Sequence, residues 1–423
     1  MSIPQKGTYV HADLPLLKFT QLSKTQQSIP QLAGFKFYKT NVHSGPQSIQ
    51  GEGITYINDG IADVRLAPVQ EIANMYKSSC ASKMALQSLE YGSTMGNLEL
   101  RKVLVNYLNE TRGIKLRIDN ILITRGSQMG IYLASQLLIE SDDVVLVGET
   151  NYISADYTFL NAGAHLCRIP VDDHGVDTKA IEVVCKKRTV RAVYVTSHHH
   201  HPTTKTMSAE RRLHLLNLAQ EYKFAIIEDD YDYDFHYNHA PILPLVSHDV
   251  HGQVIYVGSL SKTVAPAFRI GYLIAAKEFI TEASNLRHYI DRQGDPLLEL
   301  TFSKFIKSGS LNRHINKTIN VYRNRRDLFV ERFLELTAYF DFEVPTGGMA
   351  FWLKLKSPYS WKEVAVTARK YDLEIGQWKR YDINRNLHNS IRMGFASYNE
   401  EEINTLFDKL ARTMEDLRRH LYG

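Results

Sequence analysis

Short apolar runs alternate with amphipathic stretches between residues 120 and 276. The runs are rich in Val and Ile, which favours strands, and the stretches between them repeat apolar positions at helical spacing. Strands that alternate with helices predict a mostly parallel sheet covered by helices, an α/β fold. The seven predicted strands are residues 121–124, 144–149, 165–171, 192–197, 224–230, 254–259 and 271–276.

The pattern changes after this region. Residues 277–335 are mostly helical and highly charged, and 316–336 predicts one long helix that could bridge two domains. An apolar strand after a Pro-Thr-Gly-Gly turn, a helix, a further strand and a closing helix then predict a smaller α+β domain. We therefore expect an irregular N-terminal arm (1–50), a large domain (51–290) and a small domain (291–423, with part of the arm).

Composition narrows the class of protein. The 423 residues are 44% hydrophobic and 23% charged, with a net charge of +4, which fits a globular chain and lacks the basic excess of a nucleic-acid binder. Cys80, Cys167 and Cys185 are too scattered for a disulfide framework or a metal knuckle and suit a reducing compartment. The chain shows no signal peptide and no apolar run of membrane-spanning length, so we expect a cytoplasmic protein.

The segment from Gly258 to Tyr272 follows a predicted strand and gathers Ser259, Ser261, Lys262 and Arg269. Hydroxyls and a guanidinium suit a phosphate, and a lysine beside other cations can form a Schiff base. The alternative is a surface lysine in a polar loop.

Acids end the preceding strand. Asp229 and Tyr231 would lie at the carboxyl edge of the sheet, where open α/β sheets bind ligands. A carboxylate can keep a pyridine nitrogen protonated, and a phenol can contact the ring oxygen of the same cofactor. Residues in such positions are also often solvated loop residues or helix caps.

Two earlier segments add candidates. Gly126, Ser127 and Gln128 lead from a strand directly into a helix and offer backbone N–H groups to an anion. The spacing matches neither a dinucleotide fingerprint nor a P-loop. Tyr152 follows the next strand, where its ring could stack on a flat ligand or simply pack in the core.

Together these segments resemble the fold type I enzymes that depend on pyridoxal 5'-phosphate (PLP), in particular the class I and II aminotransferase domain of MocR-type GntR regulators and of related stand-alone aminotransferases. The resemblance covers about residues 50–415. Its motifs are YGSTMGNLELRKVLVNYL, ITRGSQMGIYLA, VYVTSHHHHPTTKTM, IIEDDYDYDFHY, GSLSKTVAPAFRIGY and SIRMGFAS.

The resemblance implies a role for each candidate. Lys262 would hold PLP as a Schiff base, Asp229 would face the ring nitrogen and Tyr231 the ring hydroxyl. Arg392 would grip the substrate carboxylate with a backbone N–H of Gly60. The implied contacts to the rest of PLP are stacking by Tyr152, phosphate binding by Ser127, Gln128, Ser259, Ser261 and Arg269, and a phosphate contact from Tyr91 of the neighbouring subunit of a homodimer.

The sequence departs from the family at two places. His201 stands where many aminotransferases have an asparagine that contacts the ring hydroxyl, so it either donates there or points away. Thr94 replaces the usual proline after Tyr91. The run His198 to His201 also suggests a metal site, but residues of an extended strand point to alternate faces and no further ligand motif lies nearby, so we expect no metal.

Residues 5–15 resemble the end of the winged-helix domain of GntR regulators, as a remnant, a truncation or by chance. Only six residues precede Gly7 of this motif, whereas a winged helix needs about 60 or more, so we expect no DNA-binding domain in this chain and no nucleic-acid partner.

We therefore expect a homodimeric PLP-dependent aminotransferase that moves an amino group between an α-amino acid and a 2-keto acid. The alternatives are an effector-sensing PLP module of a regulator, and another PLP reaction at the α-carbon such as racemisation or decarboxylation. The sequence does not predict which amino acid is used.

Overall fold

The computed structural model describes residues 2–3, 7–8, 32–37, 53–237, 242–376, 378–381 and 388–422. The chain divides into two units, Met1–Gln47 and Ser48–Gly423. In the first unit β1 (Ser2–Ile3) pairs antiparallel with β2 (Gly7–Thr8). Most of the predicted arm, and most of the motif at residues 5–15, lie outside the described residues.

The second unit contains the predicted seven-stranded sheet, in the order β4-β12-β11-β10-β9-β5-β6. All seven predicted strands are confirmed, and β12 alone among them runs antiparallel to its neighbours. Their bounds are β4 Ile121–Thr124, β5 Val144–Gly148, β6 His165–Ile169, β9 Ala192–Val195, β10 Ala225–Asp230, β11 Val254–Ser259 and β12 Gly271–Ile274. A short hairpin, β7 (Val171–Asp172) with β8 (Gly175–Val176), follows β6.

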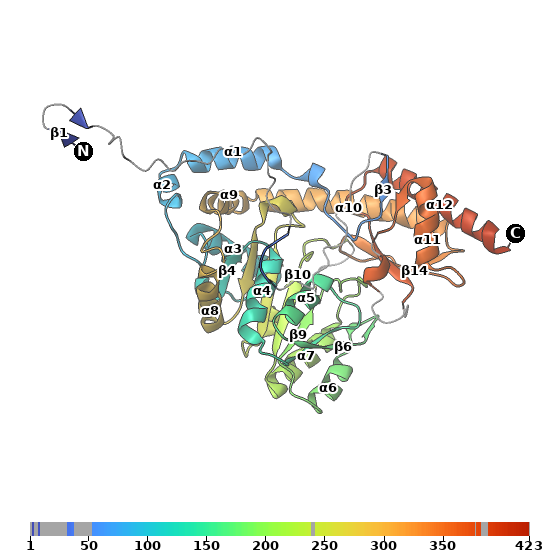
Figure 1. Cartoon of the computed structure of the whole chain (residues 1–423), viewed down its shortest axis with the longest axis horizontal. Helices are drawn as coiled ribbons and strands as arrows, with labels where there is room; N and C mark the ends of the chain where they lie inside the picture. The colour runs from blue at the N-terminus through green and yellow to red at the C-terminus, as the bar shows by residue number, and fades with distance from the viewer. Residues whose placement is uncertain are drawn as a thin grey trace. The chain divides into compact units, whose positions relative to one another are not determined.

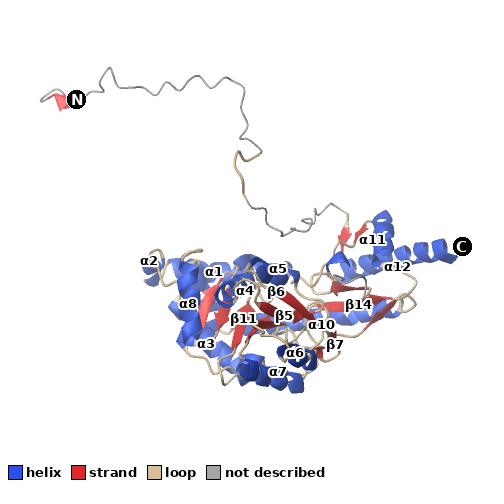
Figure 2. Cartoon of the chain, turned by 60° about the horizontal axis from the view of Figure 1, so that its bottom comes forward, coloured by secondary structure: helices blue, strands red, loops and turns tan. Residues whose placement is uncertain are grey.

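Helices cover both faces of this sheet because its strands place apolar residues alternately on its two faces. One core packs α4, α5 and α8 against the sheet, and two others pack α1, α3 and α9, and α6 and α7, against the opposite face; Figure 2 shows α4 and α5 on one side and α6 and α7 on the other. The helices are α1 Val69–Cys80, α2 Met84–Ser88, α3 Leu98–Arg112, α4 Ser127–Leu138, α5 Ile153–Asn161, α6 Thr178–Cys185, α7 Ala209–Tyr222, α8 Lys277–His288 and α9 Pro296–Lys307. As predicted, Ser208 caps α7 by accepting from the Arg211 N–H.

A separate core forms around a three-stranded antiparallel sheet in the C-terminal part. The long α10 (Ser310–Leu334) runs from the neighbourhood of α9 to this sheet, as Figure 1 shows. The strands are β13 Phe340–Phe342, β14 Ala350–Leu355 and β16 Ser390–Gly394, and the covering helices are α11 Trp361–Ala368 and α12 Glu400–Tyr422. The predicted bridging helix and α+β character are thus confirmed. The domain boundary at residue 290 stays a prediction.

Residues 55–66 join this C-terminal part. The strand β3 (Thr55–Tyr56) pairs with β15 (Leu373–Glu374), and Asp63 accepts a 2.9 Å hydrogen bond from the buried Arg325 of α10. The remaining elements are short 3₁₀ helices: η1 Val64–Leu66, η2 Ile118–Asn120, η3 Leu245–His248, η4 Pro266–Phe268, η5 Arg369–Tyr371 and η6 Trp378–Arg380. Among the described residues no helix is long and apolar enough to cross a membrane.

Candidate active site

Lys262 lies in the link between β11 and β12, at the carboxyl edge of the sheet. Its Nζ donates a 2.8 Å hydrogen bond to the carbonyl oxygen of Gly60. Burial lowers the pKa of Lys262 below its ordinary value; Arg392 acts in the same direction and Asp59 opposes it. A lowered pKa increases the fraction of free amine, the form that attacks a carbonyl carbon.

Asp229 is buried near the end of β10. Its Oδ2 accepts a 2.8 Å hydrogen bond from Tyr194, and its Oδ1 has no hydrogen-bond partner among the described residues. Burial raises the pKa of Asp229 to about 7, while the Tyr194 hydrogen bond lowers it. A buried carboxylate oxygen without a donor is costly. A protonated ring nitrogen of PLP would supply that donor, so this residue fits the cofactor.

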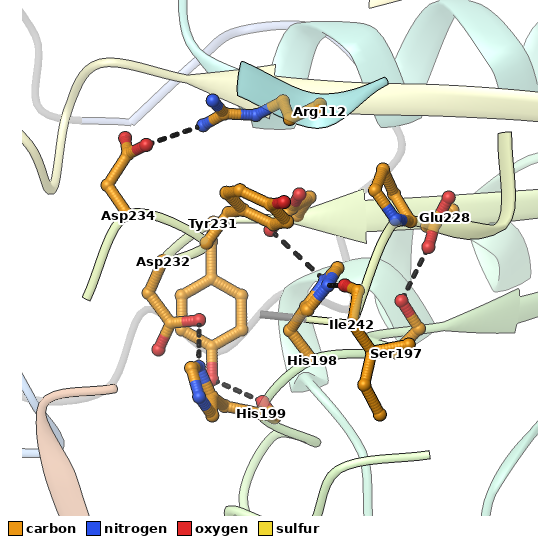
Figure 3. Close-up of polar contacts among 12 residues, drawn as sticks. Arg112, Ser197, His198, His199, Glu228, Tyr231, Asp232, Asp234 and Ile242 are labelled. Carbon is orange, nitrogen blue, oxygen red and sulfur yellow. Dashed lines mark hydrogen bonds and ion pairs between the residues drawn. The ribbon is translucent and has the colours of Figure 1, made fainter. Parts of the chain in front are cut away.

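Tyr231 follows β10, and its hydroxyl lies between two partners. It donates to the carbonyl oxygen of His199 over 2.6 Å and accepts from Nη2 of Arg392 over 3.2 Å. The ring of His199 is held in turn by Asp232, whose Oδ1 lies 2.8 Å from Nδ1 (Figure 3). These contacts fix the phenol in place at the carboxyl edge of the sheet.

Arg392 lies on β16 and is almost completely buried, at 2% exposure. Its guanidinium also donates to the backbone carbonyl oxygens of Asp59, over 2.8 Å, and Pro202, over 3.2 Å. All these partners are neutral, and no carboxylate of the described residues forms an ion pair with it. A buried guanidinium with neutral partners attracts a ligand carboxylate, which it can bind through two N–H groups.

Two glycines bring the N-terminus of α4 against the Lys262 segment. Gly126 has a φ of 78°, and a Cβ there would lie 2.8 Å from Nη2 of Arg269. A Cβ on Gly271 would lie 2.7 Å from the Cα of Gly126. Only glycine fits this close approach, and the space it leaves puts the Arg269 guanidinium beside the first residues of the helix.

The groups gathered here are of the kinds that bind phosphates in proteins. Ser127 begins α4, whose N-terminus carries free N–H groups and a positive dipole end. Ser259 Oγ donates to Ser261 Oγ over 2.8 Å and accepts from the Ser261 N–H over 3.0 Å. With Arg269 these residues form a cationic, donor-rich cradle that fits the phosphate of PLP.

Gln128, Tyr152 and His201 lie around the same edge. Gln128 Nε2 donates to Thr158, and its Oε1 is buried without a partner in the described part of the chain. The rings of Tyr152 and His201 meet edge to face at 5.4 Å. Both line a cavity of about 200 Å³ whose other lining residues are Asp59, Asn151, Ile153, Ser154, Arg380 and Tyr381.

The four consecutive histidines have separate environments. Nε2 of His198 lies 2.6 Å from the Ile242 carbonyl oxygen, and His200 contacts Thr203. Burial lowers the pKa of His201 well below its ordinary value, so the ring is neutral, and its Nδ1 has no partner among the residues described. Within the described part of the chain, no group of three or more His, Cys, Asp or Glu side chains is arranged to hold a metal ion.

Two predicted site residues make contacts in the structure that differ from those expected at the site. Tyr91 is 79% exposed, with the guanidinium of Arg292 4.1 Å from its ring centroid. The N–H of Gly60, predicted to face a substrate carboxylate, donates to Oδ1 of Asn58 over 2.9 Å, while its carbonyl oxygen accepts from Lys262. The roles of both residues stay predictions.

Sequence analysis did not identify Tyr194, Asp59 or Tyr381. A tyrosine inside an apolar strand has the signature of a core residue, so nothing marked Tyr194 as the partner of Asp229. Asp59 directly precedes Gly60, which was the available signal for it.

Comparison with known proteins places this geometry in a family. The family model described as aminotransferase class I and II matches residues 60–410. The aromatic-amino-acid aminotransferase 1 of Thermococcus litoralis is 28% identical over 374 residues, which are 87% of this chain and 89% of that protein. An uncharacterized HTH-type transcriptional regulator of Bacillus subtilis, YdeL, is 28% identical over 75% of this chain and 68% of its own length.

Solved structures give the same result. The kynurenine aminotransferase of Pyrococcus horikoshii superimposes with a TM-score of 0.79 at 28% identity, covering 86% of this chain and 91% of that one. The multiple substrate aminotransferase of Thermococcus profundus has a TM-score of 0.82 at 27% identity, covering 88% and 94%.

Proposed function

The chain belongs to the aminotransferase class I and II family, and we propose that Lys262, Asp229 and Arg392 carry its reaction. It is a PLP-dependent aminotransferase of fold type I, and it moves an amino group between an α-amino acid and a 2-keto acid. When bound, PLP supplies an electron sink that stabilises negative charge at the substrate α-carbon.

Each of the three residues has a defined task. The Lys262 amine would hold the cofactor, and in its free form Nζ would be the base that takes the α-proton of the substrate. Asp229 would accept a hydrogen bond from the ring nitrogen through Oδ1. Arg392 binds the substrate carboxylate and so orients the α-carbon toward Lys262.

The observation that carries this proposal is the buried Arg392, which has only neutral partners among the described residues and bonds Tyr231 beside the cofactor lysine. A panel of amino acids with a keto-acid acceptor tests it. At least one member should bleach the absorbance of the lysine-bound cofactor and yield a new amino acid. No bleaching with any member would contradict the aminotransferase assignment of these residues.

Relatives indicate where the panel should begin. Proteins similar to this chain are named for aromatic amino acids and for kynurenine. The cavity beside Tyr152 is also lined by the aromatic side chain of Tyr381 and by the polar side chains of Asp59 and Arg380. We therefore propose aromatic amino acids as the first donors to be assayed.

We also propose that the enzyme is a cytoplasmic homodimer with shared active sites. The exposed Tyr91 lies in a stretch with other exposed apolar side chains, Leu86 at 76% and Leu89 at 71%, and Tyr289 is 86% exposed. Exposed apolar groups of this size favour burial against a second copy. Tyr91 would then contact the cofactor phosphate of the neighbouring subunit. The three cysteines are free, which suits a reducing compartment.

The similarity to transcriptional regulators supports a second candidate function, that of an effector-sensing module that binds PLP and an amino compound. Such a module would shift the cofactor absorbance without releasing a keto acid. Racemisation or decarboxylation would release the inverted amino acid or an amine, so product analysis of the same panel separates these reactions.

A further inference from the structure

Tyr194 and Tyr256 stand on the two strands that flank β10, and each donates a hydrogen bond to one of two consecutive acids. The Tyr194 hydroxyl lies 2.8 Å from Oδ2 of Asp229, and the Tyr256 hydroxyl lies 2.5 Å from Oδ2 of Asp230. Both tyrosines are buried, at 1% and 0% exposure. Because successive strand residues face opposite sides, the two pairs lie on opposite faces of the sheet.

The register gives both pairs the same geometry. Tyr194 is paired with the residue two positions before Asp229, and Tyr256 with the residue two positions before Asp230. Each phenol therefore reaches diagonally along one face to an acid nearer the carboxyl edge. The chain thus contains two matched tyrosine–aspartate pairs around one strand.

The surroundings of the two acids differ. Asp230 faces the positive charge of Arg112, and its Oδ1 lies 3.7 Å from Nδ1 of His198. Oδ1 of each acid has no hydrogen-bond partner in the described part of the chain, but Asp229 lies on the face that packs α4. The titratable groups around Asp229, besides Tyr194, are Asp232, Tyr152 and Tyr231. Only the Asp229 pair is thus on the face that carries the phosphate cradle.

We propose that Tyr194 is a positioning residue for the reaction: its hydroxyl orients Asp229 and stabilises the ionised carboxylate, so that Oδ1 is presented to the PLP ring nitrogen. The proposal rests on the role given to Asp229. Without this donor Asp229 becomes more basic, because a hydrogen bond to the charged form favours that form. The proton of the ring nitrogen would then move toward the carboxylate, and the less cationic ring would withdraw electron density from the Schiff base less strongly.

The test compares Tyr194→Phe with Tyr256→Phe, since each removes one hydroxyl from a buried ring bonded to an acid of β10. Titration of PLP into the apoenzyme should give a Kd raised about tenfold or more by Tyr194→Phe and changed less than about threefold by Tyr256→Phe. The pH midpoint of the absorbance of bound PLP should rise in Tyr194→Phe alone, because a less cationic ring makes the Schiff-base nitrogen more basic. Equal effects of the two variants, or no effect of Tyr194→Phe, would overturn the proposal.

A double-variant comparison shows whether Tyr194 acts through Asp229. In an Asp229→Asn background, Tyr194→Phe should change the Kd for PLP by less than about twofold. If it weakens binding as much as in the wild-type chain, the positioning role is wrong. If Asp229→Asn alone leaves the Kd and the absorbance unchanged, the proposed role of Asp229 fails; if only Tyr194→Phe is silent, the inference about Tyr194 fails.

Discussion

Lys262 donates from Nζ to the carbonyl oxygen of Gly60, a residue 202 positions earlier in the chain, over 2.8 Å. Lys262 lies in the link between two strands of the large sheet, whereas Gly60 lies in the segment that joins the C-terminal strands through β3 and β15. The amine therefore lies where these two parts of the second unit meet, next to the arginine that we assign to the substrate.

Replacing Lys262 by Ala should abolish the absorbance of covalently held PLP, because it removes the amine that we propose to form the Schiff base. Lys277→Ala is the matched control, since its side chain is 71% exposed and only pairs with Asp119. Spectra of both variants with added PLP check this. If the band persists in Lys262→Ala, the lysine assignment is wrong.

Arg392→Ala should raise the KM for amino acids about 100-fold, since it removes a buried charge that would bind the α-carboxylate. Steady-state kinetics measure the effect. Simple amines without a carboxylate are the control substrates, and their slow reaction should change less than about threefold. An unchanged KM for amino acids would contradict the proposed role.

Shared active sites make a prediction about mixed dimers. Tyr91→Ala and Lys262→Ala each impair every site in their own homodimers, but a mixed dimer would place both defects in one site and leave the other intact. An equal mixture, unfolded and refolded together, should recover about a quarter of wild-type activity, because half of the dimers are mixed and each has one good site. If the refolded mixture is dimeric by chromatography but recovers no activity, Tyr91 acts in the site of its own subunit.

The buried acids of β10 predict how the stability of the apoprotein depends on pH. Burial raises the pKa of Asp230 to about 8 and that of Asp229 to about 7, so the folded chain holds protons that the unfolded chain has released. The stabilisation that the two protonated acids give the folded chain is fully present below their ordinary pKa of 3.8. It is lost as the pH rises through their folded-state pKa values, by up to ~1.4 kcal/mol of unfolding free energy per pH unit for each acid.

Urea unfolding of the apoprotein between pH 3.8 and about pH 8 measures the slope of the free energy of unfolding against pH. Asp230→Asn should flatten it, since the amide does not titrate. Asp341→Asn, which changes an exposed acid of β13, should leave the slope as it is and shift the free energy of unfolding by less than about 0.5 kcal/mol. A slope that Asp230→Asn does not alter would show that this acid is already ionised in the folded chain.

The sequence predicted the sheet well because its strands are buried on both faces and appear as continuous apolar runs, as in Val144–Gly148 and Val254–Ser259. The two-residue strands β3 and β15 were not predicted. They carry no periodicity of their own, and their pairing depends on a contact between residues more than 300 positions apart. A separation of 262 positions likewise hid the interaction of Asp63 with Arg325.

The candidate site divides in a similar way. Residues whose chemistry is rare in a strand or tight turn, such as Asp229 and Lys262, could be proposed from type and order, and their roles stay predictions. The hydrogen bond from Tyr194 to Asp229 depends on strand register, and the bond of the Gly60 N–H to Asn58 depends on a local turn. Neither is encoded in residue type, so the sequence could not separate them from packing contacts.

Because β12 returns antiparallel to β11, the segment with Lys262 begins and ends at one paired position, Ser259 opposite Gly271. A surface crossover can lengthen without moving the strands that it joins. In this segment an added residue would change the position of Arg269, whose guanidinium lies beside Gly126 at the start of α4. Insertions that diversify such a chain are therefore better tolerated elsewhere, because the length of this one link sets where its cation lies relative to the helix.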